Sequence, residues 1–71
     1  MMKSNIMSLK KGDVFICIDN NLEFFTRGAV YEVIAEAYFD GEEMSIETYD
    51  DFGSVHLISE GWFDEHFLTF K

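Results

Sequence analysis

The side chains best suited to chemistry in this chain are two histidines, His56 and His66, and a single cysteine. An imidazole beside a carboxylate can act as a base or as a pH-sensitive contact, and two imidazoles with a carboxylate can bind a transition metal. His66 stands close to Asp64 and Glu65, but no short ligand spacing connects this group to His56. We therefore expect each histidine to pair with an acidic neighbour in a structural role, and we expect no metal site.

The cysteine, Cys17, lies between Ile16 and Ile18 in an apolar run. A nucleophilic cysteine needs exposure and a neighbouring base or cation, and these flanks offer neither. The sequence therefore predicts a buried thiol in the core. Because no second cysteine can close an internal disulfide, we expect a reducing compartment and a cytoplasmic location, while a bridge to another molecule stays open.

The acidic clusters at 40–43 and 50–51 lack the alternating oxygen ligands of a calcium loop, so turn chemistry explains them better. Asp51-Phe52-Gly53 has the letters of the metal-binding triplet of protein kinases. A chain of 71 residues without a glycine-rich loop or a catalytic loop cannot be a kinase. We expect no catalytic residue and no cofactor, and we predict that the protein is not an enzyme.

Negative charge dominates the chain, with a formal net charge of −9. From Gly28 to Phe70 there are 11 carboxylates and no lysine or arginine. Such a surface repels phosphates, which argues against direct binding of nucleic acid. Mimicry of DNA by the carboxylates is a minority alternative, because Ile34 separates Glu32 from Glu36. No segment approaches the roughly 20 apolar residues of a membrane span, so no membrane association is expected.

Short apolar segments separated by glycine and aspartate predict strands. The run 14–18 is rich in β-branched residues and reads as a strand buried on both faces. The segment 29–38 alternates regularly and predicts one long strand. Asp40-Gly41 favours a two-residue type I′ turn, which places Ala35 opposite Ile46 on the core face.

A second connection follows, and pairing Tyr49 with Ser54 across it continues the sheet. This register places Ile46 opposite Leu57 on the core face and Glu47 opposite His56 on the other face. Residues 62–66 can form one helical turn, with Trp62 and Phe63 closing the core, and 67–70 can form a final strand.

This layout resembles the SH3-like small barrel. The run Lys11-Gly12-Asp13 with Phe15 looks like the pattern of short uncharacterised phage and prophage barrels. The other positions in the resemblance are Gly28, Tyr31, Val33, the segment 50–53, His56 and Phe67. It implies an all-β fold, a five-stranded SH3-like barrel over residues 9–71 with one short helical turn before the last strand. Residues 1–8 are expected to form a flexible N-terminal arm.

The predicted register gathers acidic and aromatic side chains on the face of the sheet that points away from the core. Carboxylates without counter-charges repel one another across strands, which suggests that a partner supplies the cations. The candidate partner-binding residues are Glu32, Ile34, Glu36, Tyr38, Glu43, Glu47, Tyr49, His56 and Ile58.

We therefore expect a non-catalytic acidic protein-interaction module. The phage resemblance implies an inhibitor that binds a basic surface of a bacterial host or defence protein. Alternatives are a small-molecule-binding protein centred on the histidines and nearby rings, a structural subunit of a virion or other assembly, and a homo-oligomer. The same face can also serve only to keep a small barrel in solution.

Overall fold

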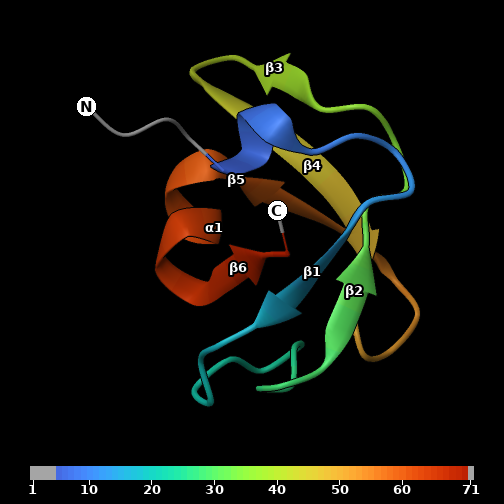
Figure 1. Ribbon diagram of the computed structural model, residues 1–71, viewed down its shortest axis with the longest axis vertical. Coiled ribbons are helices and arrows are strands. Elements are labelled where there is room, and N and C mark those ends of the chain that lie inside the picture. Colours follow the sequence, from blue (N-terminus) through green and yellow to red (C-terminus); the bar gives the residue numbers. More distant parts are fainter. Residues whose placement is uncertain (1–4, 71) are drawn as a thin grey trace.

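The structure, a computed structural model, describes residues 5–70. The described part begins with a short 3-10 helix, η1 (Asn5–Ser8), and continues with β-strands and one α-helix near its end (Figure 1). The strands are β1 (Val14–Cys17), β2 (Val30–Glu32), β3 (Tyr38–Asp40), β4 (Glu43–Tyr49), β5 (Val55–Ser59) and β6 (Phe67–Thr69), and the helix is α1 (Glu60–His66).

Within residues 5–70, six strands form two antiparallel sheets of three strands, in the orders β2-β1-β6 and β3-β4-β5. The mostly β character expected from the sequence is confirmed, but the described strands do not close into a barrel. The predicted long strand 29–38 is interrupted at 33–37, so its two ends join different sheets as β2 and β3. Within the interruption, the backbone N–H of Ile34 donates to the carbonyl of Glu47 at 2.9 Å, which ties this segment to β4.

The turn between β3 and β4 lies one residue later than predicted. Asp40 pairs with Glu43, so Gly41 and Glu42 form the loop, and only Gly41 has a positive φ, at 74°. A type I′ turn needs positive φ at both central residues, so the predicted turn type was wrong. Each residue of β4 therefore pairs with a residue two positions later in the chain than predicted; Met44, for example, pairs with Phe39. Because side chains alternate along a strand, a shift of two leaves the faces of β4 as predicted, and Ile46 and Thr48 are fully buried.

The register between β4 and β5 differs from the prediction by one residue, and this changes every face assignment on β5. Ile46 pairs with Ile58, not with Leu57. The cause is the connection 50–54, where the Asp50 carboxylate accepts backbone N–H bonds from Phe52 and Ser54 and lengthens the turn. Since side chains alternate along a strand, Ile58 points into the core and Leu57 points outward.

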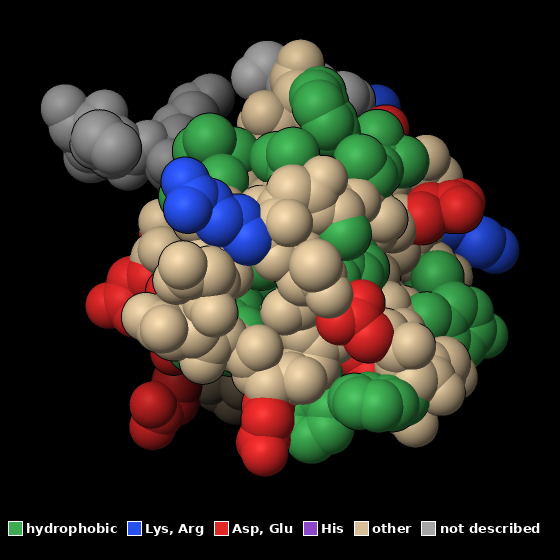
Figure 2. Space-filling view, turned by 90° about the horizontal axis from the view of Figure 1, so that it is seen from below, with side chains coloured by type: hydrophobic (Ala, Val, Ile, Leu, Met, Phe, Trp, Pro, Cys, Tyr) green, Lys and Arg blue, Asp and Glu red, His purple; other side chains and the backbone are tan. Residues whose placement is uncertain are grey.

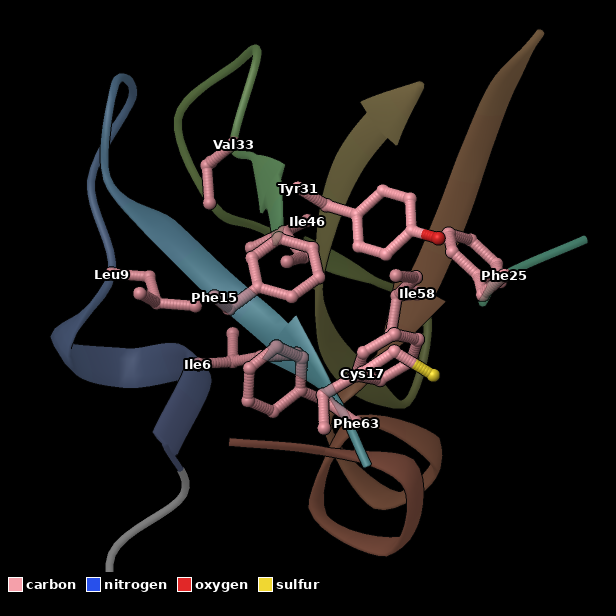
Figure 3. Close-up of a cluster of buried hydrophobic side chains, with 11 residues drawn as sticks. Ile6, Leu9, Phe15, Cys17, Phe25, Tyr31, Val33, Ile46, Ile58 and Phe63 are labelled. Carbon is pink, nitrogen blue, oxygen red and sulfur yellow. The ribbon is translucent and has the colours of Figure 1, made fainter. Parts of the chain in front are cut away.

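Large rings fill the core between the two sheets (Figure 3). Phe15 packs edge-on against Phe63 and Phe67, at ring-centroid distances of 5.2 and 5.3 Å. Cys17 is buried, as predicted. Ile6 is also fully buried, and residues 5–8 form η1. The prediction of a flexible arm over residues 1–8 was therefore wrong for residues 5–8, and residues 1–4 lie outside the described residues.

Helix α1 begins directly after β5 and is two residues longer than the predicted turn at 62–66. Glu60 lies in its first turn, where a negative charge suits the helix dipole, and His66 lies in its last turn. It buries Phe63 and ends at His66, because the backbone of the next residue, Phe67, is extended. Neither this helix nor any other helix between residues 5 and 70 combines the length and apolar content of a membrane span.

Candidate functional site

The corrected register creates a surface on the β3-β4-β5 sheet that differs from the predicted one. Tyr49 pairs with Val55, and Glu47 pairs with Leu57, on the side of the sheet away from the core. Tyr49 is 53% exposed, Val55 58% and Leu57 42%. Together with Tyr38, these residues are called the mixed face: Tyr38, Glu47, Tyr49, Val55 and Leu57. It combines exposed apolar groups with one carboxylate at its centre.

Tyr38 and Glu47 are joined by a hydrogen bond in which the phenol donates to Glu47 Oε2 at 3.0 Å. Desolvation and this carboxylate both raise the pKa of Tyr38 above its ordinary value. The phenol therefore stays protonated and keeps Glu47 aligned. The remaining oxygen of the Glu47 carboxylate is available to a cation approaching the mixed face.

A groove of about 400 Å³ adjoins the mixed face at Tyr49. Residues of β2 and of the end of β4 line it, and a hydrogen bond joins these two strands: Thr48 Oγ1 donates to the carbonyl of Glu32 at 2.6 Å. The groove is open to solvent, and its lining is mostly apolar. The lining residues are Lys11, Val30, Tyr31, Glu32, Val33, Ile34, Thr48 and Tyr49.

Most of the predicted partner-binding residues lie in or beside these two features. Glu32, Ile34 and Tyr49 line the groove, and Tyr38 and Glu47 belong to the mixed face. Carboxylates and hydrophobic side chains also lie next to each other on the surface seen in Figure 2.

Two of the other predicted residues are acidic and stand apart from the groove. Glu36 is exposed in the segment between β2 and β3. Glu43 is half-buried, because its Oε1 accepts the N–H of Gly61 at 3.0 Å at the start of α1. Glu36 is therefore accessible to solvent, whereas Glu43 links β4 to the start of α1.

His56 and Ile58 do not lie on the mixed face, which corrects their predicted place beside Glu47. Ile58 is fully buried. His56 pairs with Thr48 in the sheet, and its Nδ1 lies 3.2 Å from Oδ2 of Asp50. The one-residue change of register accounts for both corrections, because it turns even-numbered residues of β5 inward.

An aromatic group surrounds His56. Its ring stacks on Trp62 with an interplanar angle of 9° and a centroid distance of 6.3 Å, and Phe24 and Phe25 lie 5.4 and 5.1 Å away. Asp50 is almost fully buried beside it. Burial raises the pKa of Asp50, but hydrogen bonds from His56 and from the backbone of Ser54 and Phe52 outweigh it, so the pKa lies below its ordinary value.

His66 makes a similar pair with a distant acid. Its Nδ1 lies 2.7 Å from Oδ2 of Asp19, and its ring packs against Trp62 at 4.9 Å. The backbone N–H of Asn21 and the bond to His66 lower the pKa of Asp19 below its ordinary value. Each histidine thus pairs with its own aspartate, and both imidazole rings lie against Trp62. The described residues contain no cluster of three or more metal-ligand side chains.

Sequence reasoning missed the role of Asp51, which joins two loops. Its carboxylate accepts bonds from Thr26 Oγ1 at 2.8 Å and from the Tyr31 hydroxyl at 2.7 Å. Its backbone N–H donates to the carbonyl of Phe24 at 2.9 Å. Desolvation, together with Asp51, raises the pKa of Tyr31. We call these contacts the Asp51 clamp; it fixes loop 18–29 against turn 50–54.

Sequence reasoning also missed Val55 and Leu57 as exposed apolar groups. Both lie on β5, where Val55, Leu57 and Ser59 alternate with His56 and Ile58. Either set could have faced the core, and the length of the preceding turn decided between them. The acidic turn Asp50-Asp51 was the available signal, because aspartate often bonds its own turn backbone.

Both histidines of the site are engaged with aspartates, His56 with Asp50 and His66 with Asp19. No protein-family model, curated protein or solved structure matches the chain.

Proposed function

We propose that this protein is a non-catalytic interaction module whose mixed face and adjoining groove bind a protein with a basic surface. The observation that carries the proposal is the pairing of Tyr49 with Val55 beside Glu47. More than half of each apolar side chain is exposed, yet both stand on a rigid strand pair. An exposed tyrosine beside aliphatic groups is a typical anchor of a protein interface.

Charge supplies the second part of the proposal. With a net charge of −9, the chain attracts a cationic surface from a distance and repels polyanions. Glu32 at the groove and Glu47 at the centre of the mixed face provide local acceptors for lysine or arginine. The carboxylates would then determine orientation and association rate, and Tyr49 would supply most of the affinity.

The SH3-like relationship belongs to the same proposal. A loop joins β1 to β2, a meander of β3, β4 and β5 follows, and a helical turn precedes β6, which returns to β1. This order supports an SH3-like topology in which one bent segment, 29–40, serves both sheets. On the phage resemblance of its turns and core positions, the partner would be a bacterial host or defence protein that this chain inhibits.

A small-molecule site around His56 and Trp62 is the main alternative. Their stacked rings favour it. The groove contains neither residue, however, and Phe25 and Asp50 occupy the space beside the imidazole. A virion or assembly subunit would instead need contacts between copies that continue beyond a closed pair.

The test is affinity capture from bacterial lysate with immobilised wild-type protein and two variants of the mixed face, Tyr49→Ala and Glu47→Lys. Phe39→Ala is the matched control, because Phe39 is 64% exposed but is not part of the mixed face. We expect a captured basic protein to be lost with both face variants, retained by the control, and released by salt.

Binding of the purified captured protein should then shift the amide resonances of residues 47–49 and 55–57. Equal capture by all four proteins, or capture that salt does not weaken, would contradict the proposal. Binding of a metabolite that shifts only His56 and Trp62 would favour the alternative.

A further inference from the structure

The second sheet carries an exposed surface of which the proposed function uses only Val30, in the lining of the groove. On its outer side Ile16 lies between Val30 and Leu68. Continuing the β1–β6 register places Phe70 beside Val14. Val30 is 55% exposed, Leu68 49% and Phe70 60%. We call this surface the apolar face: Val14, Ile16, Ile18, Val30, Leu68 and Phe70.

The residue pattern of β1 shows why this surface is unusual. A strand with one solvated side alternates apolar and polar residues, whereas a strand covered on both sides is apolar throughout. Phe15 and Cys17 point into the core, and the outward residues Val14, Ile16 and Ile18 are all β-branched and apolar. The sequence therefore has the pattern of a strand covered on both sides, but nothing among residues 5–70 covers the outer side.

We infer that a second copy of this chain covers the apolar face, with the two β2-β1-β6 sheets packed face to face. The charge distribution selects this occupant. Two copies each carrying −9 repel wherever carboxylates meet, but on this face the neighbouring strand positions contribute only Glu32, beside Val14. Contact through this face therefore brings few like charges together.

The other candidate occupants fit this surface less well. A basic partner is attracted to carboxylates, which this face nearly lacks, so it would bind at the mixed face. An anionic membrane would repel the chain as a whole. Interfaces between identical subunits are more apolar than those of transient complexes. The apolar face has the composition of an interface between identical subunits.

The geometry also suits two-fold symmetry. Ile16 is at the centre of the sheet, with Val30 and Leu68 at either side, so an axis near Ile16 would place the side chains of one copy over those of the other. Stacked sheets lie about 10 Å apart, a distance that such side chains fill. A standard interface removes about 800 Å² from each partner, which is roughly a sixth of the 4646 Å² surface of this chain.

The test is sedimentation equilibrium of the wild-type protein over a concentration series reaching about 1 mM, where even an association of about −4 kcal/mol is visible. We expect a species of twice 8.3 kDa. Leu68→Lys and Ile18→Lys should each raise the dimer dissociation constant at least about tenfold. Leu57→Lys makes the same charge change on the mixed face and should leave the dimer intact. Circular dichroism shows whether each variant is folded.

A wild-type protein that stays monomeric throughout, or a dimer lost with Leu57→Lys but not with Leu68→Lys, would overturn this inference. Salt separates it from the proposed function. Added salt should strengthen the dimer by screening the repulsion between two acidic chains, and it should weaken binding of a basic partner. Monomeric Leu68→Lys should still capture the basic partner. The dimer and the binding of the partner can therefore each be disproved without the other.

Discussion

The imidazole of His56 and the carboxylate of Asp50 face each other across the turn from β4 to β5, with Nδ1 and Oδ2 3.2 Å apart. The same carboxylate holds the turn itself through the N–H groups of Phe52 and Ser54. Asp50 therefore links the conformation of a turn to the packing of a ring against Trp62. A single side chain determines both the length of the connection and the face that each residue of β5 occupies.

The lowered pKa values of Asp50 and Asp19 make acid sensitivity a direct prediction. A carboxyl group whose folded pKa lies below its ordinary value of 3.8 stabilises the fold above that value. This contribution is lost as the pH falls through the folded pKa. The free energy of unfolding, measured by urea titration at a series of pH values, should therefore fall below about pH 4.

Asp50→Asn should be less stable than the wild type at neutral pH and should show a shallower loss in acid. Glu42→Gln is the control, because Glu42 is exposed in the β3–β4 loop. Identical pH profiles for wild type and Asp50→Asn would show that the contacts of Asp50 do not stabilise the fold.

Loss of the Asp51 clamp should loosen two loops together. In Asp51→Ala, Thr26 Oγ1 and the Tyr31 hydroxyl lose their acceptor. Each hydrogen bond contributes about 1 kcal/mol. Exchange of the Thr26 amide, which donates to the Tyr31 oxygen, should therefore accelerate by a factor between about 5 and about 30, for one or both bonds lost. Hydrogen exchange followed by NMR measures this, with exposed Glu23→Ala as control. Faster exchange in turn 50–54 alone would mean that the loops are not coupled.

The core prediction concerns Phe63, which is fully buried and packs on Phe15 and Phe67. Phe63→Ala should lower the free energy of unfolding by about 3–5 kcal/mol, which is most of the stability of a domain this small. Phe39→Ala removes a ring that is 64% exposed and should change the value by less than about 0.5 kcal/mol. Urea unfolding followed by tryptophan fluorescence distinguishes them, and equal losses would contradict the core assignment.

Two glycines should respond to alanine in opposite ways. Gly53 has a φ of 81°, which an L-residue adopts at a cost of about 1–2 kcal/mol, so Gly53→Ala should destabilise. Gly61 lies within α1, where alanine gains about 1 kcal/mol of helix propensity. Its added Cβ would lie 3.3 Å from Oε1 of Glu43, the end of a side chain that can move. Thermal unfolding should rank Gly61→Ala above wild type and Gly53→Ala below it.

Local patterns were sufficient to predict much of the fold. The β-branched run at 14–17 became β1, the ring spacing at 62–67 placed Phe63 and Phe67 in the core, and Cys17 was buried. These assignments depend on periodicity and on the side chains of near neighbours. The break at 33–37 was not predictable from the regular alternation, because it depends on contacts with β4 that the segment itself does not encode.

The candidate site depended on register, which local patterns did not determine. One residue in the turn after Asp50 moved Val55 and Leu57 to the surface and turned His56 and Ile58 inward. The neighbour Glu65 does contact His66, with Nε2 and Oε1 3.5 Å apart. The shorter contact of His66, 2.7 Å to Asp19, was not predictable by proximity, since the two residues are 47 positions apart.

The pairing of β6 with β1 also has a consequence for synthesis of the chain. β1 is made early, but its second partner strand ends at Thr69. Phe15 and Cys17 therefore lack part of their cover until the ribosome has passed that residue and the segment has left the exit tunnel. Folding in the cell should accordingly wait until β6 has emerged, and it should be limited by closing a long loop and not by forming local turns. Until then, the apolar side chains of β1 are exposed to chaperones.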